Sequence, residues 1–369
     1  MRTAVRLLCS DDESVPVSTH TLNKLQLKHP KAPADWSASP ALLASSLSVD
    51  EAEVLQAIRS FPAGSSGGPD GFRPQHLLDL VSCRESGADL LTSLMAFTNL
   101  LLQGKSHLDM TSILLGGRLV ALNKKSGGIH LIAVGFTLRR LASKCANSYA
   151  VSKLTPYFAP HQMGAGVKGG CEAAVHATLR FLGSLQPGSV IAKLDFSNAF
   201  NCLHRDSMLE AVSQQISEIY NYCHSAYTHH SVLWFDEQVI WLKEDPQQGD
   251  TLGLLLFCLT VQPLLNSLQS PLVAGFINDF ALGGPEYVVD RDTAVVTSTG
   301  TNLGLHLNVA TCQLVHPQGS VIKSAVLGSF KSTAPDEATL LGAPLLPSKS
   351  LSVSLPVMSF GLWQDGSPS

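Results

Sequence analysis

Two short stretches place acidic residues at the ends of expected strands: VIAKLDFSNAFN at 190–201 and GFINDFALGG at 275–284. The first begins as an apolar run that ends in Asp195, which is typical of a buried strand with a carboxylate at its end. The second predicts a β-hairpin with Asn278 and Asp279 at its turn. Either feature alone is better explained as a cap or turn residue, so the information lies in their order along the chain.

Between these stretches, QQGDTLGLLLF at 247–257 leads into a long apolar segment, 251–268. This segment is marginal in length for a membrane span, and it contains Gln262, Pro263 and Asn266. We therefore expect a buried helix. After the hairpin, a further helix and GLHLNVATCQLV (304–315) predict an αβ unit.

The part of the chain before 190 is expected to be helical after a polar lead-in. Residues 1–47 carry Pro and Ser clusters and predict an extended lead-in. SVDE at 48–51 has the spacing of a capping box, so a helix should begin there with Val54, Leu55 and Ile58 on one face. Apolar periodicity predicts further helices, at 76–80, 89–102, 169–188 and around 208–216.

The composition is that of a folded protein. Of 369 residues, 45% are hydrophobic and 15% are charged, which excludes a mostly disordered chain, a coiled coil and a polybasic tail protein. The eight cysteines form no C-x-x-C pair, and the N-terminal apolar run is too short for a signal peptide. We expect reduced thiols and an intracellular protein, nuclear or cytoplasmic, with no transmembrane segment. The Cys and His residues of YCHSAYTHH (222–230) fit no zinc-finger spacing.

Positive charge is concentrated in one part of the chain. The formal net charge is -4, yet between 105 and 168 nine Lys or Arg residues accompany a single acid, Asp109. One interpretation is a solvated basic face, and the other is a surface that contacts phosphates. Under the second interpretation, Arg139, Arg140 and Lys144 are candidate nucleic-acid-binding residues.

The order of these motifs resembles the reverse transcriptase domain of non-LTR (LINE-like) retrotransposon polyproteins. The resemblance covers most of the chain, from about residue 50 to residue 345. It rests on seven blocks in the family's order: SSGGPDGFRPQHLL (65–78), RLVALNKKSGGIHLIAVGFTLRRLASK (118–144), VIAKLDFSNAFN, QQGDTLGLLLF, GFINDFALGG, GLHLNVATCQLV and LLGAPL (340–345).

The resemblance implies an α+β fold of the right-hand polymerase kind, with fingers and an antiparallel palm sheet. It places the fingers at 48–185 and the palm at 186–345, and it leaves 346–369 as an irregular C-terminal tail with an incomplete thumb. The alternative fold is a large α/β domain with a parallel sheet. A parallel sheet would need a crossover connection in place of the hairpin, so the hairpin distinguishes the two.

The family's activity is nucleotidyl transfer by an RNA-directed DNA polymerase. A primer 3′-hydroxyl on an RNA or DNA template attacks a deoxynucleoside triphosphate, and two Mg²⁺ ions about 4 Å apart stabilise the attacking and leaving oxygens. By resemblance, Asp195 and the backbone carbonyl of Phe196 are metal ligands. Asn278 and Asp279 occupy the family's catalytic hairpin, and Asp279 is the acidic candidate ligand there.

Other positions match the family's nucleotide-binding residues. Phe200 lies where the family has an aromatic ring that excludes a 2′-hydroxyl, although core packing also explains a phenylalanine at this position. Gln248 and Gly249 match the block that lines the nucleotide pocket. Lys124 and Lys125 fall in the fingers, where a cation meets the triphosphate.

Several positions depart from the family pattern. Asn278 stands at the metal-binding Asp, and Asp279 is a doubtful substitute because side chains alternate between faces along a strand. Thr311 replaces a Lys that is a candidate general acid, and His130 replaces an Arg of the fingers. Loss of one preorganised charged group lowers a rate by about 10²–10³, so impaired activity is expected.

Three functions of different classes remain open. The first is an active or formerly active reverse transcriptase. The second is a catalytically silent polymerase fold that binds nucleic acid or a protein, and the third is the product of a decaying retroelement with no selected role. The departures favour the second and third, which the sequence does not separate, and template choice and oligomeric state stay open.

Overall fold

The computed structural model describes residues 15–16, 18–28, 42–123, 129–242, 246–247, 249–317 and 319–345, with the backbone alone at 108–109, 129–131 and 242. The chain divides into two compact units. Unit 1 combines Met1–Cys145 with Asn221–Gly253, and unit 2 combines Ala146–Tyr220 with Leu254–Ser369. Each unit therefore consists of two segments, whereas the sequence predicts a single boundary near residue 185.

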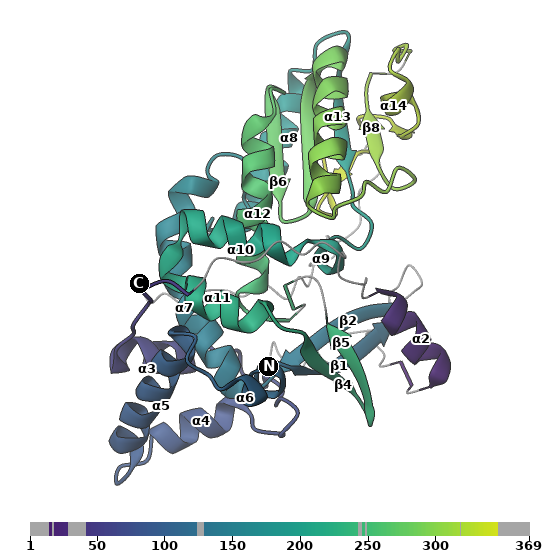
Figure 1. The fold of residues 1–369 in the computed structure, drawn as a ribbon. Helices are drawn as coiled ribbons and strands as arrows, with labels where there is room; N and C mark the ends of the chain where they lie inside the picture. The colour runs from purple at the N-terminus through teal and green to yellow at the C-terminus, as the bar shows by residue number, and fades with distance from the viewer. Residues whose placement is uncertain are drawn as a thin grey trace. The chain divides into compact units, whose positions relative to one another are not determined.

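Unit 1 contains short helices and one sheet (Figure 1). Its helices are α2 (Thr19–Lys28), α3 (Glu51–Arg59), α4 (Pro74–Val81), α5 (Gly87–Leu102), α6 (Leu108–Leu114), the first part of α7 (Thr137–Phe158) and nearly all of α11 (Tyr220–Tyr227). Its strands are β1 (Gly117–Asn123), β2 (Ile129–Gly135), β4 (Ser231–Phe235) and β5 (Gln238–Leu242). Helices α4 and α5 confirm the helices predicted at 76–80 and 89–102.

A capping box starts α3, but two residues later than the sequence predicts. The Asp50 carboxylate accepts a hydrogen bond from the Glu53 amide at 2.8 Å, and the Glu53 carboxylate accepts one from the Asp50 amide at 2.9 Å. Asp50, not Ser48, is therefore the N-cap. The buried face of α3 consists of Val54, Ala57 and Ile58.

The sheet of unit 1 has the strand order β2-β1-β4-β5. Strands β1 and β2 are antiparallel, as are β4 and β5, and β1 runs parallel to β4. Leu25 of α2 packs against one face of the sheet, in a cluster with Leu119, Ala121, Ala133, Leu233, Phe235 and Ile240. The expectation of an extended lead-in over 1–47 was therefore wrong for Thr19–Lys28, because a helix there buries Leu25 against the strands.

Unit 2 contains a five-stranded sheet with helices around it (Figure 1). Its strand order is β6-β7-β3-β8-β9, for β6 (Leu272–Phe276), β7 (Asp279–Pro285), β3 (Ser189–Leu194), β8 (Gln313–Val315) and β9 (Lys331–Thr333). All neighbouring strands are antiparallel except β8 and β9. The predicted hairpin is thus confirmed as β6–β7, and a parallel sheet is excluded for this unit.

The remaining elements of unit 2 include both long and very short helices. They are the second part of α7, α8 (Gly170–Gly183), α9 (Ala199–Cys202), α10 (Arg205–Gln215), η1 (Ser217–Ile219), α12 (Gly253–Ser267), α13 (Glu286–Asn302), α14 (Ala325–Gly328) and the hairpin of β10 (Thr339–Leu340) and β11 (Ala343–Pro344). The apolar segment forms α12, whose side chains are largely buried, as the sequence predicts. Among the helices of the described residues, none is long and apolar enough to cross a membrane.

Different elements cover the two faces of the β3 region. Leu194 and Phe280 pack with Val261 of α12 and Val296 of α13. Ile191 and Ala281 belong to a second cluster, with residues of α8 and of the β10–β11 hairpin. Because side chains alternate along β3, the residue after Leu194 points to the second face, and it does so where the strand ends.

Candidate functional site

Strand register brings Asp195 and Asp279 together. In the antiparallel pair of β3 and β7, the last pair is Leu194 and Phe280, and continuing this register by one residue sets Asp195 opposite Asp279. Residues opposite each other in a sheet carry their side chains on the same face, with Cβ atoms about 4.5–5.5 Å apart. The continued register agrees with the predicted proximity of Asp195 to the hairpin, and the charge of Asp195 acts on Asp279. It puts the Asp279 carboxylate on the same face as that of Asp195, whereas its role as a metal ligand stays a prediction.

The other neighbour of Asp195 holds it in place. The register of β3 with β8 pairs Lys193 with Gln313, and its continuation puts Thr311 opposite Asp195. The Thr311 hydroxyl donates a hydrogen bond of 2.7 Å to Oδ2 of Asp195. The Asn308 amide donates to the Asp195 carbonyl at 2.8 Å, so both the backbone and the side chain of Asp195 are tied to 308–311.

The hairpin turn consists of Ile277 and Asn278, since Phe276 pairs with Asp279. Asp279 is thus the first residue of β7, so the prediction that it lies at the turn together with Asn278 was wrong. Ile277 has a φ of 60°, which is unfavourable for a β-branched residue. The buried Gln162 braces it, because its amide accepts a hydrogen bond from the Ile277 N–H at 2.8 Å and donates one to the Ile277 carbonyl at 3.1 Å.

The charges at this sheet end are unbalanced. Partial desolvation and the charge of Asp195 raise the pKa of Asp279 to about 6, although the side chain still reaches solvent. Lys193 lies on the same face, two residues before Asp195, and opposes this rise. Burial lowers the pKa of Lys193 itself, and its ammonium donates to the Gln313 side chain at 2.9 Å. Among the described residues, the two carboxylates therefore share their face with the partly desolvated cation of Lys193.

This donor set fits one Mg²⁺ ion. Mg²⁺ is held in proteins by one or two carboxylates, together with water and substrate oxygens. Asp195 and Asp279 can supply the two carboxylates. The backbone of Asp195 and Ser197 bonds to 306–308, so the Phe196 carbonyl between them points away from that segment. Within the described residues, no group of three or more His, Cys, Asp or Glu residues could hold a metal.

Phe200 lies on α9, shortly after Asp195. Its ring stacks on Phe257 of α12, with centroids 4.7 Å apart and an angle of 28° between the planes. The side chain is only half-buried, whereas Phe196 is 4% exposed. Phe200 therefore packs against the core with one side and leaves part of its ring accessible.

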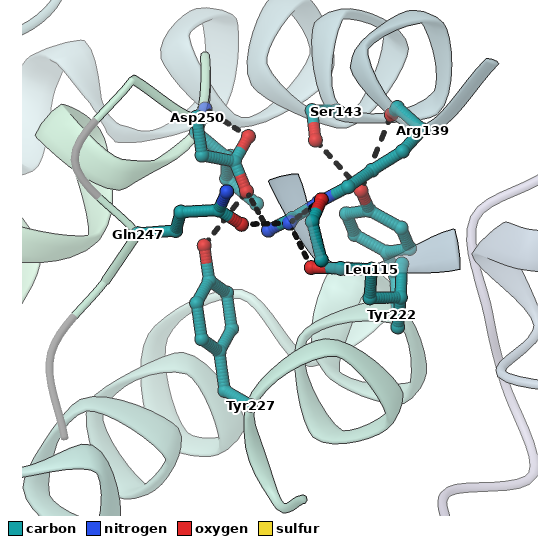
Figure 2. Close-up of polar contacts among 9 residues, drawn as sticks. Leu115, Arg139, Ser143, Tyr222, Tyr227, Gln247 and Asp250 are labelled. Carbon is teal, nitrogen blue, oxygen red and sulfur yellow. Dashed lines mark hydrogen bonds and ion pairs between the residues drawn. The ribbon is translucent and has the colours of Figure 1, made fainter. Parts of the chain in front are cut away.

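In unit 1, Arg139 is the centre of a buried polar network (Figure 2). Its guanidinium forms an ion pair of 2.9 Å with Asp250, and it also donates to the Gln247 side chain and to the Leu115 carbonyl. Tyr227 donates a hydrogen bond of 2.7 Å to the same Asp250 oxygen. Arg139 is 1% exposed, so the prediction that it contacts nucleic acid at the surface was wrong.

The other two basic candidates are buried as well. Arg140 and Lys144 are each 8% exposed, and both cations lie over the Phe61 ring, at 5.2 and 5.0 Å from its centroid. Arg140 also donates to the Ser66 carbonyl at 2.7 Å. These contacts tie α7 to the end of α3 and the following loop, so the two side chains do not form the expected phosphate-binding surface.

The predicted nucleotide-binding residues are only partly visible. Lys124, Lys125 and Gln248 lie outside the described residues. Gly249 has a φ of 109°, and a Cβ atom there would lie 2.3 Å from the Ala133 carbonyl oxygen. The backbone at Gly249 therefore passes directly against Ala133 of β2, where only glycine fits.

Sequence reasoning did not identify the contacts of three residues. Lys193 could have been noticed, because residues two apart on a strand share a face. The contact of Thr311 with Asp195 depends on the β3–β8 register, and the pairing of Asp250 with Arg139 spans 111 residues. Neither contact has a local signal in the sequence.

Comparison with known proteins finds similarity among solved structures alone. No family model and no curated protein sequence matches the chain. Among solved structures, apo telomerase from Candida tropicalis, truncated from its C-terminal domain, is similar at a TM-score of 0.44 and 13% identity. The similarity covers 56% of this chain and 51% of that chain, so this chain spans about half the length of the telomerase structure.

Proposed function

We propose that this chain is a reverse transcriptase domain, an RNA-directed DNA polymerase of the non-LTR retrotransposon kind, whose activity is weak or lost. One observation carries the proposal: the antiparallel pair of β3 and β7 ends at Leu194 and Phe280, so that Asp195 and Asp279 come next on one face, where the charge of Asp195 acts on Asp279. Nucleotidyl transfer by two metal ions requires carboxylates in such an arrangement. In this proposal, the sheet of unit 2 is the palm and the elements of unit 1 contribute the fingers.

The residues of the chain have distinct roles in this proposal. Asp195, Asp279 and the Phe196 carbonyl hold Mg²⁺, which when bound neutralises charge on the attacking and leaving oxygens. Thr311 and the Asn308 amide orient Asp195. The accessible part of the Phe200 ring packs under the sugar of a deoxynucleoside triphosphate, while a primer on an RNA or DNA template supplies the 3′-hydroxyl.

Three features close to the two carboxylates weaken the site. Asn278 brings a neutral amide where the family has a carboxylate, so the negative charge available to a second ion is reduced. Thr311 occupies one oxygen of Asp195 with a hydrogen bond. The Lys193 ammonium lies close enough to both carboxylates to compete electrostatically with a divalent cation.

Primer extension on RNA and DNA templates tests the proposal. We expect little or no Mg²⁺-dependent extension by the chain itself, and an increase of up to about 10²–10³ for Asn278→Asp, which restores a charged ligand. Asp195→Ala should abolish whatever activity is present. Mn²⁺ binding, followed by electron paramagnetic resonance, should strengthen in Asn278→Asp and weaken in Asp195→Ala.

Asn302→Asp is the matched control, because it adds the same charge at the exposed end of α13. It should leave both extension and Mn²⁺ affinity unchanged. Robust extension by the unaltered chain would contradict the weakened site, and activity that survives Asp195→Ala would contradict the residue assignment. Stronger Mn²⁺ binding without extension in Asn278→Asp would instead favour the silent polymerase fold that binds nucleic acid or a protein.

A further inference from the structure

Strand β5 is the end strand of the sheet in unit 1 (Figure 1). Its sequence, QVIWL, contains neither charge nor proline, which are the usual means of preventing an edge strand from pairing with another chain. Val239 and Trp241 are 43% and 50% exposed, and they share a face because they are two residues apart. Within the part of the chain that the structure describes, this edge thus combines unpaired backbone groups with exposed apolar side chains.

The hydrogen-bonding pattern shows which residues face the free edge. Asp236 and Glu237 form a two-residue turn, and Phe235 pairs with Gln238 across it. In such a hairpin the pair that closes the turn is hydrogen-bonded, and hydrogen-bonded pairs then alternate along the ladder. Gln238 and Ile240 therefore direct their backbone groups toward β4, while Val239 and Trp241 direct theirs outward.

We propose that β5 is a self-association edge, which pairs antiparallel with β5 of a second copy about a two-fold axis at Ile240. This register brings Val239 of each copy opposite Trp241 of the other copy. Both residues have outward N–H and C=O groups, so the two pairs form four hydrogen bonds. The exposed valine and tryptophan also meet as a cross-strand β-branched and aromatic pair. The inference is independent of the proposed function.

The strand itself favours a second copy over other occupants. Its outward groups and its apolar side chains are both symmetric about Ile240, as a two-fold interface requires. The adjoining turn carries Asp236 and Glu237, whose charges oppose the approach of a nucleic acid strand. Pairing of five-residue strands buries less than the roughly 800 Å² per partner of a stable interface, so the dimer should be weak and concentration-dependent.

Analytical ultracentrifugation of the full chain over a wide concentration range tests the proposal. The chain should shift from monomer to dimer at high micromolar concentration. Val239→Pro removes one outward N–H without touching the β4 ladder and should lower the association constant at least about tenfold. Trp241→Lys should also lower the association constant at least about tenfold. Leu80→Lys, at an equally exposed apolar residue of α4, should leave the association constant unchanged.

Amide hydrogen exchange of ¹⁵N-tryptophan-labelled protein gives a second readout that does not depend on variants. The Trp241 amide should exchange more slowly as concentration rises, because it becomes paired. The Trp234 amide points toward β1 and should not change. A chain that stays monomeric at all concentrations, a dimer that survives Val239→Pro, or Trp241 exchange that is independent of concentration would each overturn the proposal.

Discussion

Replacing Asp250 with Ala should strongly destabilise unit 1, because it leaves the Arg139 guanidinium buried without its counter-ion. The two side chains are 2% (Arg139) and 1% (Asp250) exposed and lie 2.9 Å apart. Removing one partner of a buried ion pair costs about 3–5 kcal/mol. Tyr227 also loses the acceptor of its hydroxyl, so we expect a loss of about 4 kcal/mol.

Two further variants separate the ion pair from its surroundings. Arg139→Met combined with Asp250→Leu removes both charges at similar volume and should recover most of the stability lost in Asp250→Ala, because apolar replacement of a whole buried pair is often nearly neutral. Tyr227→Phe keeps the pair and removes one hydrogen bond to a carboxylate, which should cost about 1.5–3 kcal/mol.

Acid provides an independent test of the same pair. Burial acts to raise the pKa of Asp250, but the charge of Arg139 and hydrogen bonds from neighbouring groups outweigh it, so the pKa is lowered. A lowered carboxyl pKa stabilises the fold above the unfolded value of about 3.9, and this contribution is lost as the pH falls through the folded value. Asp250→Asn should therefore lose less stability than the unaltered chain on acidification below about pH 4.

Hydrogen exchange mass spectrometry in increasing urea measures these differences, because peptides of β1 and α11 report on unit 1 separately from unit 2. The reasoning fails if Asp250→Ala stays within about 1 kcal/mol of the unaltered chain. It also fails if the double variant is less stable than Asp250→Ala.

Two further predictions concern single positions. Because the folded pKa of Asp279 is raised to about 6, stability should fall as the pH rises from about 4 to 6. Asp279→Asn should remove this fall and, with solvent screening taken into account, stabilise the metal-free protein by about 1 kcal/mol at pH 7 in urea titrations. Gly249→Ala should cost about 1–3 kcal/mol more than Gly64→Ala, because both have positive φ but only Gly249 has an atom in the way of its Cβ. Equal losses of stability at the two glycines would contradict this prediction, because they would show that the positive φ alone determines the cost of the substitution.

The antiparallel hairpin and the central strand of the unit 2 sheet were largely predictable from the sequence because their signals are local. The apolar run before Asp195 forms β3. Two further apolar runs form β6 and β7, and the short polar stretch between them indicates the hairpin. The long apolar helix is buried as predicted, since its polar Gln262 finds partners in the Tyr157 and Phe158 carbonyls. Each of these features depends on residues close together in the chain.

The prediction that the basic residues bind nucleic acid was wrong, because a local excess of positive charge does not show which distant residues the cations contact in the fold. Arg139 lies in a segment with almost no acidic residues, and its partner Asp250 comes from the block expected to line a nucleotide pocket. Arg140 and Lys144 are buried over Phe61, which is far from them in the chain. A local excess of positive charge therefore indicated a surface where the fold contains a core.

The identity of the second carboxylate depends on the length of the hairpin turn. Alternation along a strand states only that neighbouring residues face opposite ways, and it does not say which of Asn278 and Asp279 shares the face of Asp195. The two-residue turn of Ile277 and Asn278 sets Phe276 opposite Asp279, and the register of β7 with β3, continued one residue past Leu194 and Phe280, sets Asp279 opposite Asp195. A shift of one residue in this register would replace the charged partner with the neutral Asn278. The strained φ of Ile277, braced by Gln162, thus fixes the charge of the site as much as the acidic residues themselves do.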